Sequence, residues 1–170
     1  SGSKLWFCKS FNGRGTPCPV LGDGLVIVVN GKSGDVYAVE PGGEGDVTKS
    51  RMAWHTPRSG TRDLPSPTFH QGVVFVPSLR GIAACYDAAS GKELWKGRLG
   101  GNFSSSPVAA DGRIYALAEN GDVLVIAANK RYKLLAKNSV APADDEIFRS
   151  SIAISKKQLL IRSNKRIYCV

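Results

Sequence analysis

Short apolar stretches separated by tight-turn residues recur along the whole chain. In 105–128, three such stretches are separated by Asp111-Gly112 and by Asn120-Gly121. Asp-Gly and Asn-Gly between apolar runs are strong signals of a β-hairpin, because both residues tolerate the positive φ that the turn requires. No segment keeps apolar residues at helical spacing over three turns. The pattern predicts an all-β chain of short antiparallel strands.

The pattern occurs four times, and two sets of anchor residues share its period. The copies lie at 16–41, 64–87, 105–128 and 149–170. The first anchor opens the first apolar stretch of each copy and is Pro19, Pro67, Pro107 or Ile152. The second anchor is Trp6, Trp54, Trp95 or Leu135. Successive anchors of either set lie 40 to 48 residues apart, and a shared period of this length indicates a repeat architecture.

Each copy holds the strands of one propeller blade. After the third apolar stretch comes a turn such as 88–91, and a fourth stretch then carries the tryptophan. Four antiparallel strands in a repeat of about 42 residues are typical of a β-propeller. We therefore predict a β-propeller segment of four four-stranded antiparallel blades, at 9–54, 55–95, 96–135 and 136–170. Residues 1–8 are predicted to form an outer strand that closes a blade.

The segment 85–95 resembles a motif of one propeller family. The tryptophan-docking motif of pyrroloquinoline-quinone-type propellers reads A-x-D-x-x-T-G-x-x-x-W. Here Asp87, Gly91 and Trp95 match it, Ser90 replaces the threonine and Cys85 replaces the alanine. The repeats are therefore similar to those of the quinoprotein-like family, which includes the outer-membrane-assembly lipoprotein of the Bam complex. The resemblance covers nearly the whole chain and implies a bacterial extracytoplasmic location, in the periplasm or cell envelope.

The three tryptophans Trp6, Trp54 and Trp95 are predicted to be structural. A flat indole laid over a glycine of the next blade's turn buries a large apolar area in a thin gap. Glycine permits the close approach because it has no Cβ. Gly91 and Asp87 belong to such a turn. The alternative is that an indole stacks on a ligand or a cation.

The candidate chemistry does not favour an enzyme. His55 and His70 are the two histidines, and no serine or cysteine has a recognisable nucleophile context. The four cysteines form no C-x-x-C pair, and the adjacent cysteines often found in quinone-binding relatives are absent. We therefore expect no catalytic residue, no metal and no cofactor. The acidic run 144–146 lacks calcium-loop spacing.

The charge of the chain is uneven. The net charge is +9, and residues 129–170 hold ten Lys or Arg against three acidic residues. Such a patch can attract nucleic acid or an anionic surface. The other interpretation, which we favour, is a solvated edge whose cations prevent unwanted strand pairing. Nucleic acid is therefore not the expected partner, and no apolar run is long enough to span a membrane.

The loops that join the last strand of one blade to the first strand of the next emerge on one face, which we call the loop face. Binding often occurs on loops held by a rigid scaffold, so we predict that this face recognises a protein or peptide. The residues expected to contact this partner are Arg14, His55, Arg58, Arg62, Asp63, Arg98, Asn102, Phe103, Phe148 and Arg149. The alternatives are a fragment of a quinoprotein dehydrogenase or a basic-surface binder of nucleic acid.

Closure of the propeller has three possible forms. Residues 4–8 match a fourth strand, whereas 166–170 match a third strand, so each end of the chain could complete a blade begun by the other. A homodimer closing an eight-bladed ring is slightly favoured, because it would cover two apolar faces and two strand edges. A closed four-bladed monomer and an open half-ring are the alternatives.

Overall fold

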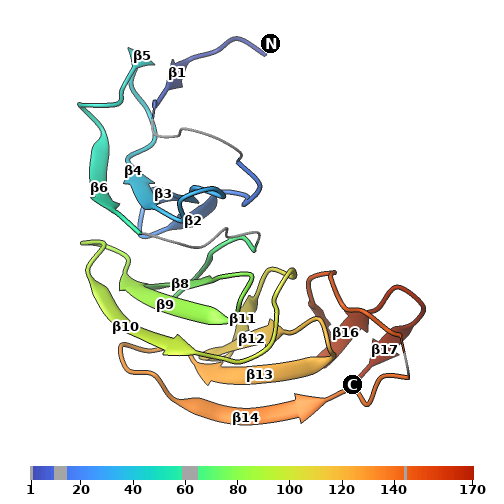
Figure 1. Cartoon of the computed structure of the whole chain (residues 1–170). Helices are drawn as coiled ribbons and strands as arrows, with labels where there is room; N and C mark the ends of the chain where they lie inside the picture. Colours follow the sequence, from blue (N-terminus) through green and yellow to red (C-terminus); the bar gives the residue numbers. More distant parts are fainter. Residues whose placement is uncertain (1, 10–14, 59–64, 144) are drawn as a thin grey trace.

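The computed structural model describes residues 2–9, 15–58, 65–143 and 145–170, and the regular elements in these ranges are all strands. Antiparallel sheets follow one another along the chain and fan around one axis, with their first strands inside and their last strands outside (Figure 1). The predicted all-β propeller segment is confirmed. No helix in the described ranges is long and apolar enough to cross a membrane.

Three blades have four strands. Blade 1 contains β2 (Val20–Gly22), β3 (Leu25–Val29), β4 (Val36–Val39) and β6 (Met52–Thr56). Blade 2 contains β7 (Thr68–His70), β8 (Val73–Pro77), β9 (Ile82–Asp87) and β10 (Glu93–Arg98). Blade 3 contains β11 (Val108–Ala110), β12 (Arg113–Leu117), β13 (Asp122–Ala127) and β14 (Leu134–Ser139). The tight turns lie where the sequence predicts them, since Asp111-Gly112 joins β11 to β12 and both residues have positive φ.

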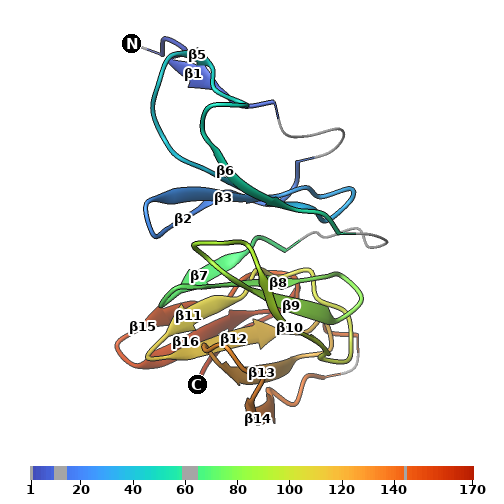
Figure 2. The ribbon, with the colours of Figure 1, turned by 90° about the vertical axis from the view of Figure 1, so that its left-hand side faces the viewer.

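Blade 4 and the first residues differ from the predicted plan of four-stranded sheets. Blade 4 has three strands, β15 (Ala153–Ser155), β16 (Gln158–Arg162) and β17 (Ile167–Cys169). Strand β1 (Trp6–Phe7) pairs in parallel with β5 (Gly45–Asp46), which lies in the connection between β4 and β6. Figure 1 places β1 at the opposite end of the arc from β17, and Figure 2 shows β1 far from the C-terminus. The four-bladed monomer is therefore wrong for the single chain, because the arc keeps these two strands apart.

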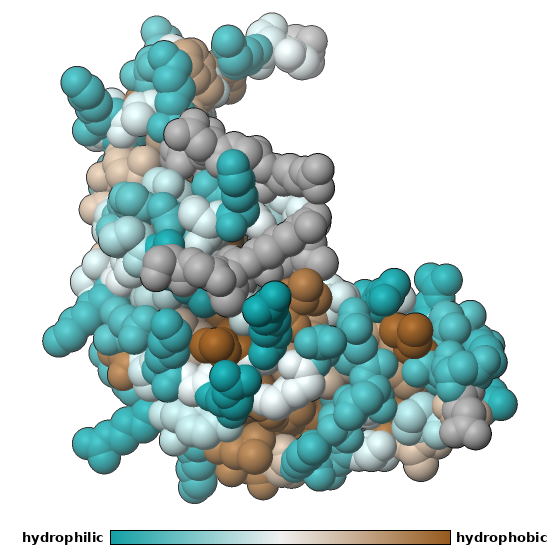
Figure 3. Space-filling view, in the orientation of Figure 1, coloured by the Kyte–Doolittle hydropathy of each residue, from teal (hydrophilic) through white to brown (hydrophobic). Residues whose placement is uncertain are grey.

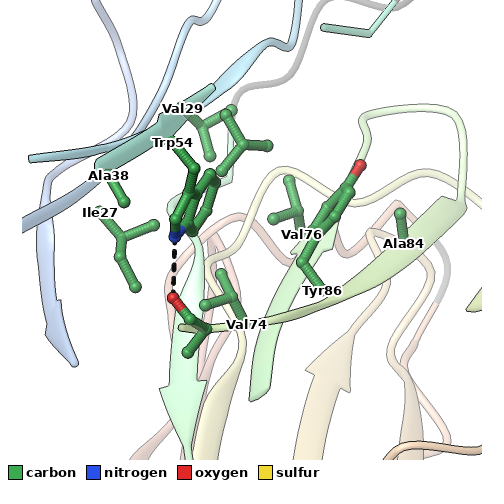
Figure 4. Close-up of a cluster of buried hydrophobic side chains, with 10 residues drawn as sticks. Ile27, Val29, Ala38, Trp54, Val74, Val76, Ala84 and Tyr86 are labelled. Atoms are coloured by element: carbon green, nitrogen blue, oxygen red, sulfur yellow. Dashed lines mark hydrogen bonds between the residues drawn. The ribbon is translucent and has the colours of Figure 1, made fainter. Parts of the chain in front are cut away.

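The hydrophobic core lies between blades rather than within one sheet. The cluster between blades 1 and 2 is drawn in Figure 4 and includes Ile27 and Ala38 from one sheet and Val74 and Tyr86 from the next. Two further clusters fill the joints between blades 2 and 3 and between blades 3 and 4. Each sheet therefore buries its apolar face only when a neighbour covers it, as repeat architectures require.

Trp54 crosses the first of these joints. Its indole Nε1 donates a 2.9 Å hydrogen bond to the carbonyl oxygen of Ala88 in blade 2 (Figure 4). A Cβ added to Gly91, whose φ is +69°, would lie 2.4 Å from the Trp54 ring. Trp95 makes a similar bond across the next joint, 3.3 Å long, to the carbonyl of Asn129. Trp95 is only half-buried, whereas Trp54 is 9% exposed.

A ladder of hydrogen bonds links the inner strands from blade to blade. The residue before each first anchor donates its backbone N–H to the side chain at the same position of the next blade. The bonds run from Cys18 to Ser66 Oγ at 2.9 Å, from Ser66 to Ser106 Oγ at 2.9 Å, and from Ser106 to Ser151 Oγ at 3.1 Å. We call this set the serine ladder. It fixes the spacing of successive blades around the inner wall.

Candidate partner-binding groove on the loop face

A groove with a volume of about 630 Å³ crosses the loop face between blades 2 and 3. Figure 3 views this face, on which hydrophilic side chains predominate. Two kinds of segment line the groove, the connections between blades and the turns between second and third strands. We call the lining residues the loop-face groove: Leu79, Arg80, Asn102, Ser104, Glu119 and Arg149.

Backbone hydrogen bonds hold each inter-blade connection between the second turn of the preceding blade and the second turn of the following blade. Phe103 N donates to Leu79 O at 2.9 Å in the turn of the preceding blade, and Glu119 N donates to Asn102 O at 2.8 Å from the turn of the following blade. The next connection repeats both bonds one blade later, from Phe148 N to Glu119 O and from Asn164 N to Ile147 O, each 3.0 Å long. The groove is therefore held by repeated main-chain contacts.

These main-chain bonds explain why two predicted contact residues are not on the surface. Phe103 is 1% exposed and Phe148 is 0% exposed, and both belong to the apolar clusters between blades. Their backbone N–H groups bind the preceding turn, so their rings are wedged into the joint beneath the connection. The prediction that these two residues contact a partner is therefore wrong.

Glu119 organises the charge in the groove. Its Oε1 accepts a 2.5 Å hydrogen bond from Ser104 Oγ and a 3.3 Å bond from Arg149 Nε. Among the lining residues that the structure describes, Glu119 is the one carboxylate, whereas Arg80 and Arg149 contribute two guanidinium groups. A charge-assisted bond of this kind orients the Arg149 side chain in the groove.

A second groove, of about 240 Å³, lies on blade 4 and is lined by residues from 147–150 and 162–164. Arg149 lines both grooves, and Arg162 adds a third guanidinium group to the second. The turn tips nearby are also cationic, because Lys32, Arg80 and Lys165 occupy the same position of the second turn in three blades. Lys165 is bonded to the Asp145 carboxylate. The lining of the two grooves is therefore rich in arginine.

His55 and Arg58 lie elsewhere, around Asp35 of blade 1. His55 Nε2 is 3.2 Å from Asp35 Oδ2, its ring stacks on Tyr37 at 4.3 Å, and Arg58 N donates to Asp35 Oδ1 at 2.9 Å. Burial raises the pKa of Asp35, but the hydrogen bonds from Arg58, His55 and Ser33 outweigh it and hold that pKa below the usual range. This cluster is a structural hub that orients the connection after β6.

The remaining predicted contact residues are divided. Arg98 is exposed at the end of β10, and Asn102 and Arg149 line the groove. Arg14, Arg62 and Asp63 lie outside the described residues. Sequence reasoning missed Leu79, Arg80 and Glu119, since it considered only the connections between blades. The topology of a blade could have revealed them, because the turn between the second and third strands lies on the same face of the propeller as the connections between blades.

The basic segment 129–170 is paired with carboxylates at many points. Five of its ten cations, Lys130, Lys137, Arg149, Lys165 and Arg166, form ion pairs with described carboxylates. The pairs other than Arg166–Glu146 join exposed or partly exposed side chains, and such pairs add little stability but reduce the local excess of positive charge.

Glu146, from the acidic run at 144–146, is buried in blade 4 rather than open to a cation. It accepts hydrogen bonds from Ser163 Oγ at 2.6 Å and Tyr168 Oη at 2.5 Å, and Arg166 lies 3.6 Å away. The bonds from Ser163 and Tyr168 lower the pKa of Glu146 to about 2. Within the described ranges, no three His, Cys, Asp or Glu side chains gather as a set of metal ligands.

The family model described as outer membrane protein assembly factor BamB matches residues 32–166. The chain belongs to this family of quinoprotein-like repeats. The fold is also that of the solved BamB structure from Moraxella catarrhalis, with a TM-score of 0.67 and 14% identity. That match covers 86% of this chain and 40% of BamB, so the chain spans about two fifths of the length of that relative. No curated protein sequence matches the chain.

Two further structures show the same fold at low identity. A quinohemoprotein alcohol dehydrogenase from Pseudomonas putida HK5 matches with a TM-score of 0.70 and 15% identity, over 94% of this chain and 30% of the dehydrogenase. The computationally designed Ika4 protein matches with a TM-score of 0.69 and 8% identity, over 100% of this chain and 99% of that chain. At these identities the likeness extends to the fold alone.

The described residues that line the loop-face groove do not fit a quinone held by calcium. Calcium takes six to eight oxygen ligands, usually with several carboxylates. The loop-face groove offers one carboxylate, Glu119, which is already bonded to Ser104 and Arg149. The cysteines are spread over separate elements, and Cys85 is buried in β9, where burial raises its pKa to about 12.

Proposed function

We propose that this chain is a non-enzymatic binding propeller that recognises an acidic, extended segment of a protein partner in the loop-face groove. The observation that carries the proposal is the lining of two grooves that share Arg149: among their described lining residues, Arg80, Arg149 and Arg162 stand against a single carboxylate. Guanidinium groups bind carboxylates through paired, planar hydrogen bonds, and a rigid groove lowers the ordering cost for an extended ligand.

The rigid setting of the groove favours binding over catalysis. Its side chains come from turns and connections that are joined by main-chain hydrogen bonds. The Glu119 carboxylate already accepts hydrogen bonds from Ser104 and Arg149. A general base needs a free proton-accepting group within reach of a nucleophile. His55 is predicted from the sequence to lie on a loop-face connection. Its ring is instead stacked on Tyr37, and its Nε2 is bonded to Asp35.

We also propose a place in the bacterial cell envelope, outside the cytoplasm. The support is the family description, which names outer membrane protein assembly. A partner in that setting would be another envelope protein that presents an acidic segment to the loop face.

The test is fluorescence polarisation with a labelled peptide of alternating Glu and Gly, and the same peptide with Lys in place of Glu. The acidic peptide should bind and the basic one should not. Arg80→Ala and Arg149→Ala should each weaken binding at least tenfold, since losing a hydrogen bond to a charged group costs about 1.5–3 kcal/mol. Arg113→Ala is the matched control, because Arg113 is exposed on the opposite face, at the turn between β11 and β12.

Equal losses in the groove variants and in Arg113→Ala would show general charge attraction and refute the groove. Two further measurements address the other functions. Arbitrary duplex DNA should not compete with the acidic peptide at physiological salt, where binding through phosphates alone is weak. Addition of pyrroloquinoline quinone and calcium should give no dye reduction with alcohols; sustained turnover would favour a quinoprotein dehydrogenase.

A further inference from the structure

Two polar groups that line the loop-face groove have hydrogen-bonding capacity that the described part of the chain does not use. The side chain of Asn102 is exposed, and its amide makes no hydrogen bond to a described residue. Glu119 uses only its Oε1, which accepts the bonds from Ser104 and Arg149, whereas its Oε2 accepts none from the described residues. The Glu119 side chain is 23% exposed. The groove therefore offers an amide and a carboxylate oxygen to a ligand.

Main-chain hydrogen bonds fix the order of the polar lining residues across the groove. The turn that carries Arg80 is bonded to the connection that carries Asn102. Glu119 N then donates to Asn102 O at 2.8 Å, and Glu119 O accepts a 3.0 Å bond from the connection that carries Arg149. The order across the groove is therefore guanidinium, amide, carboxylate, guanidinium.

The two central groups complement the main chain of an extended segment. In a β-ladder, one residue presents its N–H and its C=O to the same neighbour, which accepts from the one and donates to the other. Asn102 carries a donor, its Nδ2, and Glu119 carries an acceptor, its Oε2. The bond between their backbones sets the two residues roughly 5 Å apart, as in neighbouring strands. A donor and an acceptor at this spacing can bind both main-chain groups of one ligand residue.

We propose that Asn102 and Glu119 form a main-chain clamp, in which Asn102 Nδ2 donates to a carbonyl oxygen of the bound segment and Glu119 Oε2 accepts from its amide N–H. The clamp deepens the proposed function and rests on it. Arg80 and Arg149, which lie on either side of the clamp, bind the acidic side chains that flank the clamped residue.

The clamp determines the class of ligand that the groove accepts. An α-helix uses its main-chain N–H and C=O groups in its own hydrogen bonds, so an acidic helix cannot satisfy the clamp. A phosphate backbone has no N–H group to donate to a carboxylate. The ligand is therefore an acidic peptide segment in extended conformation, recognised by its main chain as well as by its charge.

The clamp also gives a role to the carboxylate of Glu119 among the arginines. A carboxylate that only stood beside an acidic ligand would repel it and weaken binding. A carboxylate that accepts an N–H from the ligand main chain instead forms a charge-assisted hydrogen bond, which is stronger than a bond between neutral groups. Its bond to Arg149 holds the Glu119 side chain in place for that contact.

Replacing main-chain amides by esters in the peptide of alternating Glu and Gly tests the clamp. An ester keeps the side chains and the extended geometry but has no N–H. N–H groups of successive residues point to opposite sides of an extended chain, so two peptides are needed, one with esters at every Gly N and one with esters at every Glu N. One of them should bind at least tenfold more weakly than the parent peptide, because it loses a bond to a charged group, and the other should bind like the parent.

Two variants assign the contacts to the two residues. Glu119→Gln keeps the size of the side chain but makes the acceptor neutral, so the difference in affinity between the two ester peptides should shrink severalfold. Asn102→Ala should weaken the parent peptide about fivefold, the effect of one neutral hydrogen bond. Asn138→Ala is the matched control and should bind like the unmodified protein, because Asn138 is exposed on β14 and does not line the groove.

The outcomes separate the clamp from the proposed function. If both ester peptides bind like the parent, the clamp is wrong and the carboxylates of the ligand suffice, so the proposed function stands. Equal losses with both ester peptides would also overturn the clamp, because only one side of an extended chain can face Glu119. Tighter binding of the parent peptide by Glu119→Gln, with no change in the ester difference, would mean that Glu119 only repels the ligand. Failure of the parent peptide to bind would overturn the proposed function itself.

Discussion

The joint between blades 1 and 2 and the joint between blades 3 and 4 solve the same packing problem with different chemistry. The first is apolar and is crossed by Trp54, whose ring lies against Gly91 of the next turn. The second has a smaller apolar cluster around Phe148 and Ile161. Its connection is secured by Glu146, a buried carboxylate bonded within blade 4.

The difference follows from what each neighbouring turn contains. Gly91 lets an indole approach the backbone closely at the first joint, whereas at the last joint the residue at the tryptophan anchor position, on β14, is Leu135. Without an indole seated on a glycine, the last joint relies on a polar network, which has directional bonds and depends on ionisation. The joint next to the degenerate fourth repeat is therefore stabilised by hydrogen bonds to a charged carboxylate, whereas the joint between blades 1 and 2 is stabilised by close packing of an indole on a glycine.

The largest expected effect is at Trp54. Trp54→Ala should lower the free energy of unfolding by about 3–5 kcal/mol, as for other buried large aromatic residues. Trp95→Ala should cost less, about 1.5–3 kcal/mol, because Trp95 is half-buried and rests on a turn without glycine. Chemical denaturation of both variants measures the difference, and equal losses would remove the distinction between the two docking positions.

Gly91→Ala tests the close approach itself. The new Cβ would lie 2.4 Å from the Trp54 ring, so overpacking of about 1–3 kcal/mol should add to about 1–2 kcal/mol of strain at positive φ. Gly24→Ala is the control, because Gly24 has a φ of +77° and no atom within 4 Å of the added Cβ. It should show the strain alone. If the two variants lose the same stability, Trp54 does not depend on a glycine seat.

The smallest expected effect, and the one that depends on pH, is at Glu146. Its pKa of about 2 in the folded chain is below the ordinary value of 4.5, so its stabilising contribution is complete above pH 4.5 and is lost as the pH falls towards 2. Glu146→Gln should therefore be less stable than the unmodified protein at pH 7, and the gap should narrow at pH 3. Denaturant unfolding at the two pH values measures this.

Asp145→Asn is the matched control for that comparison. Asp145 is the adjacent carboxylate, its side chain is 72% exposed, and it pairs with Lys165. Exposed pairs contribute little, so this variant should be close to the unmodified protein at both pH values. A gap for Glu146→Gln that stays constant between pH 7 and pH 3 would mean that its ionisation does not stabilise blade 4.

Several features of this protein were determined by the sequence itself. The turn pairs such as Asp111-Gly112 and Asn120-Gly121 lie between strands, because their backbone preferences are local and do not depend on distant contacts. The repeat length and the paired anchors predicted successive blades for the same reason, since each copy carries its own strand pattern. The match of residues 166–170 to a third strand likewise agrees with β17 as the third strand of blade 4.

The tertiary structure alone decided which loop residues face solvent. Phe103 and Asn102 are neighbours on one connection, yet Phe103 is buried between blades while Asn102 lines the groove. Arg80 reaches the same groove from a turn in a different part of the chain. Hydrophobic pattern cannot separate these cases, because an aromatic residue in a loop is compatible with either a binding surface or an inter-blade wedge. The decision depends on the main-chain bonds to turns of two other segments, and these form only when the blades pack together.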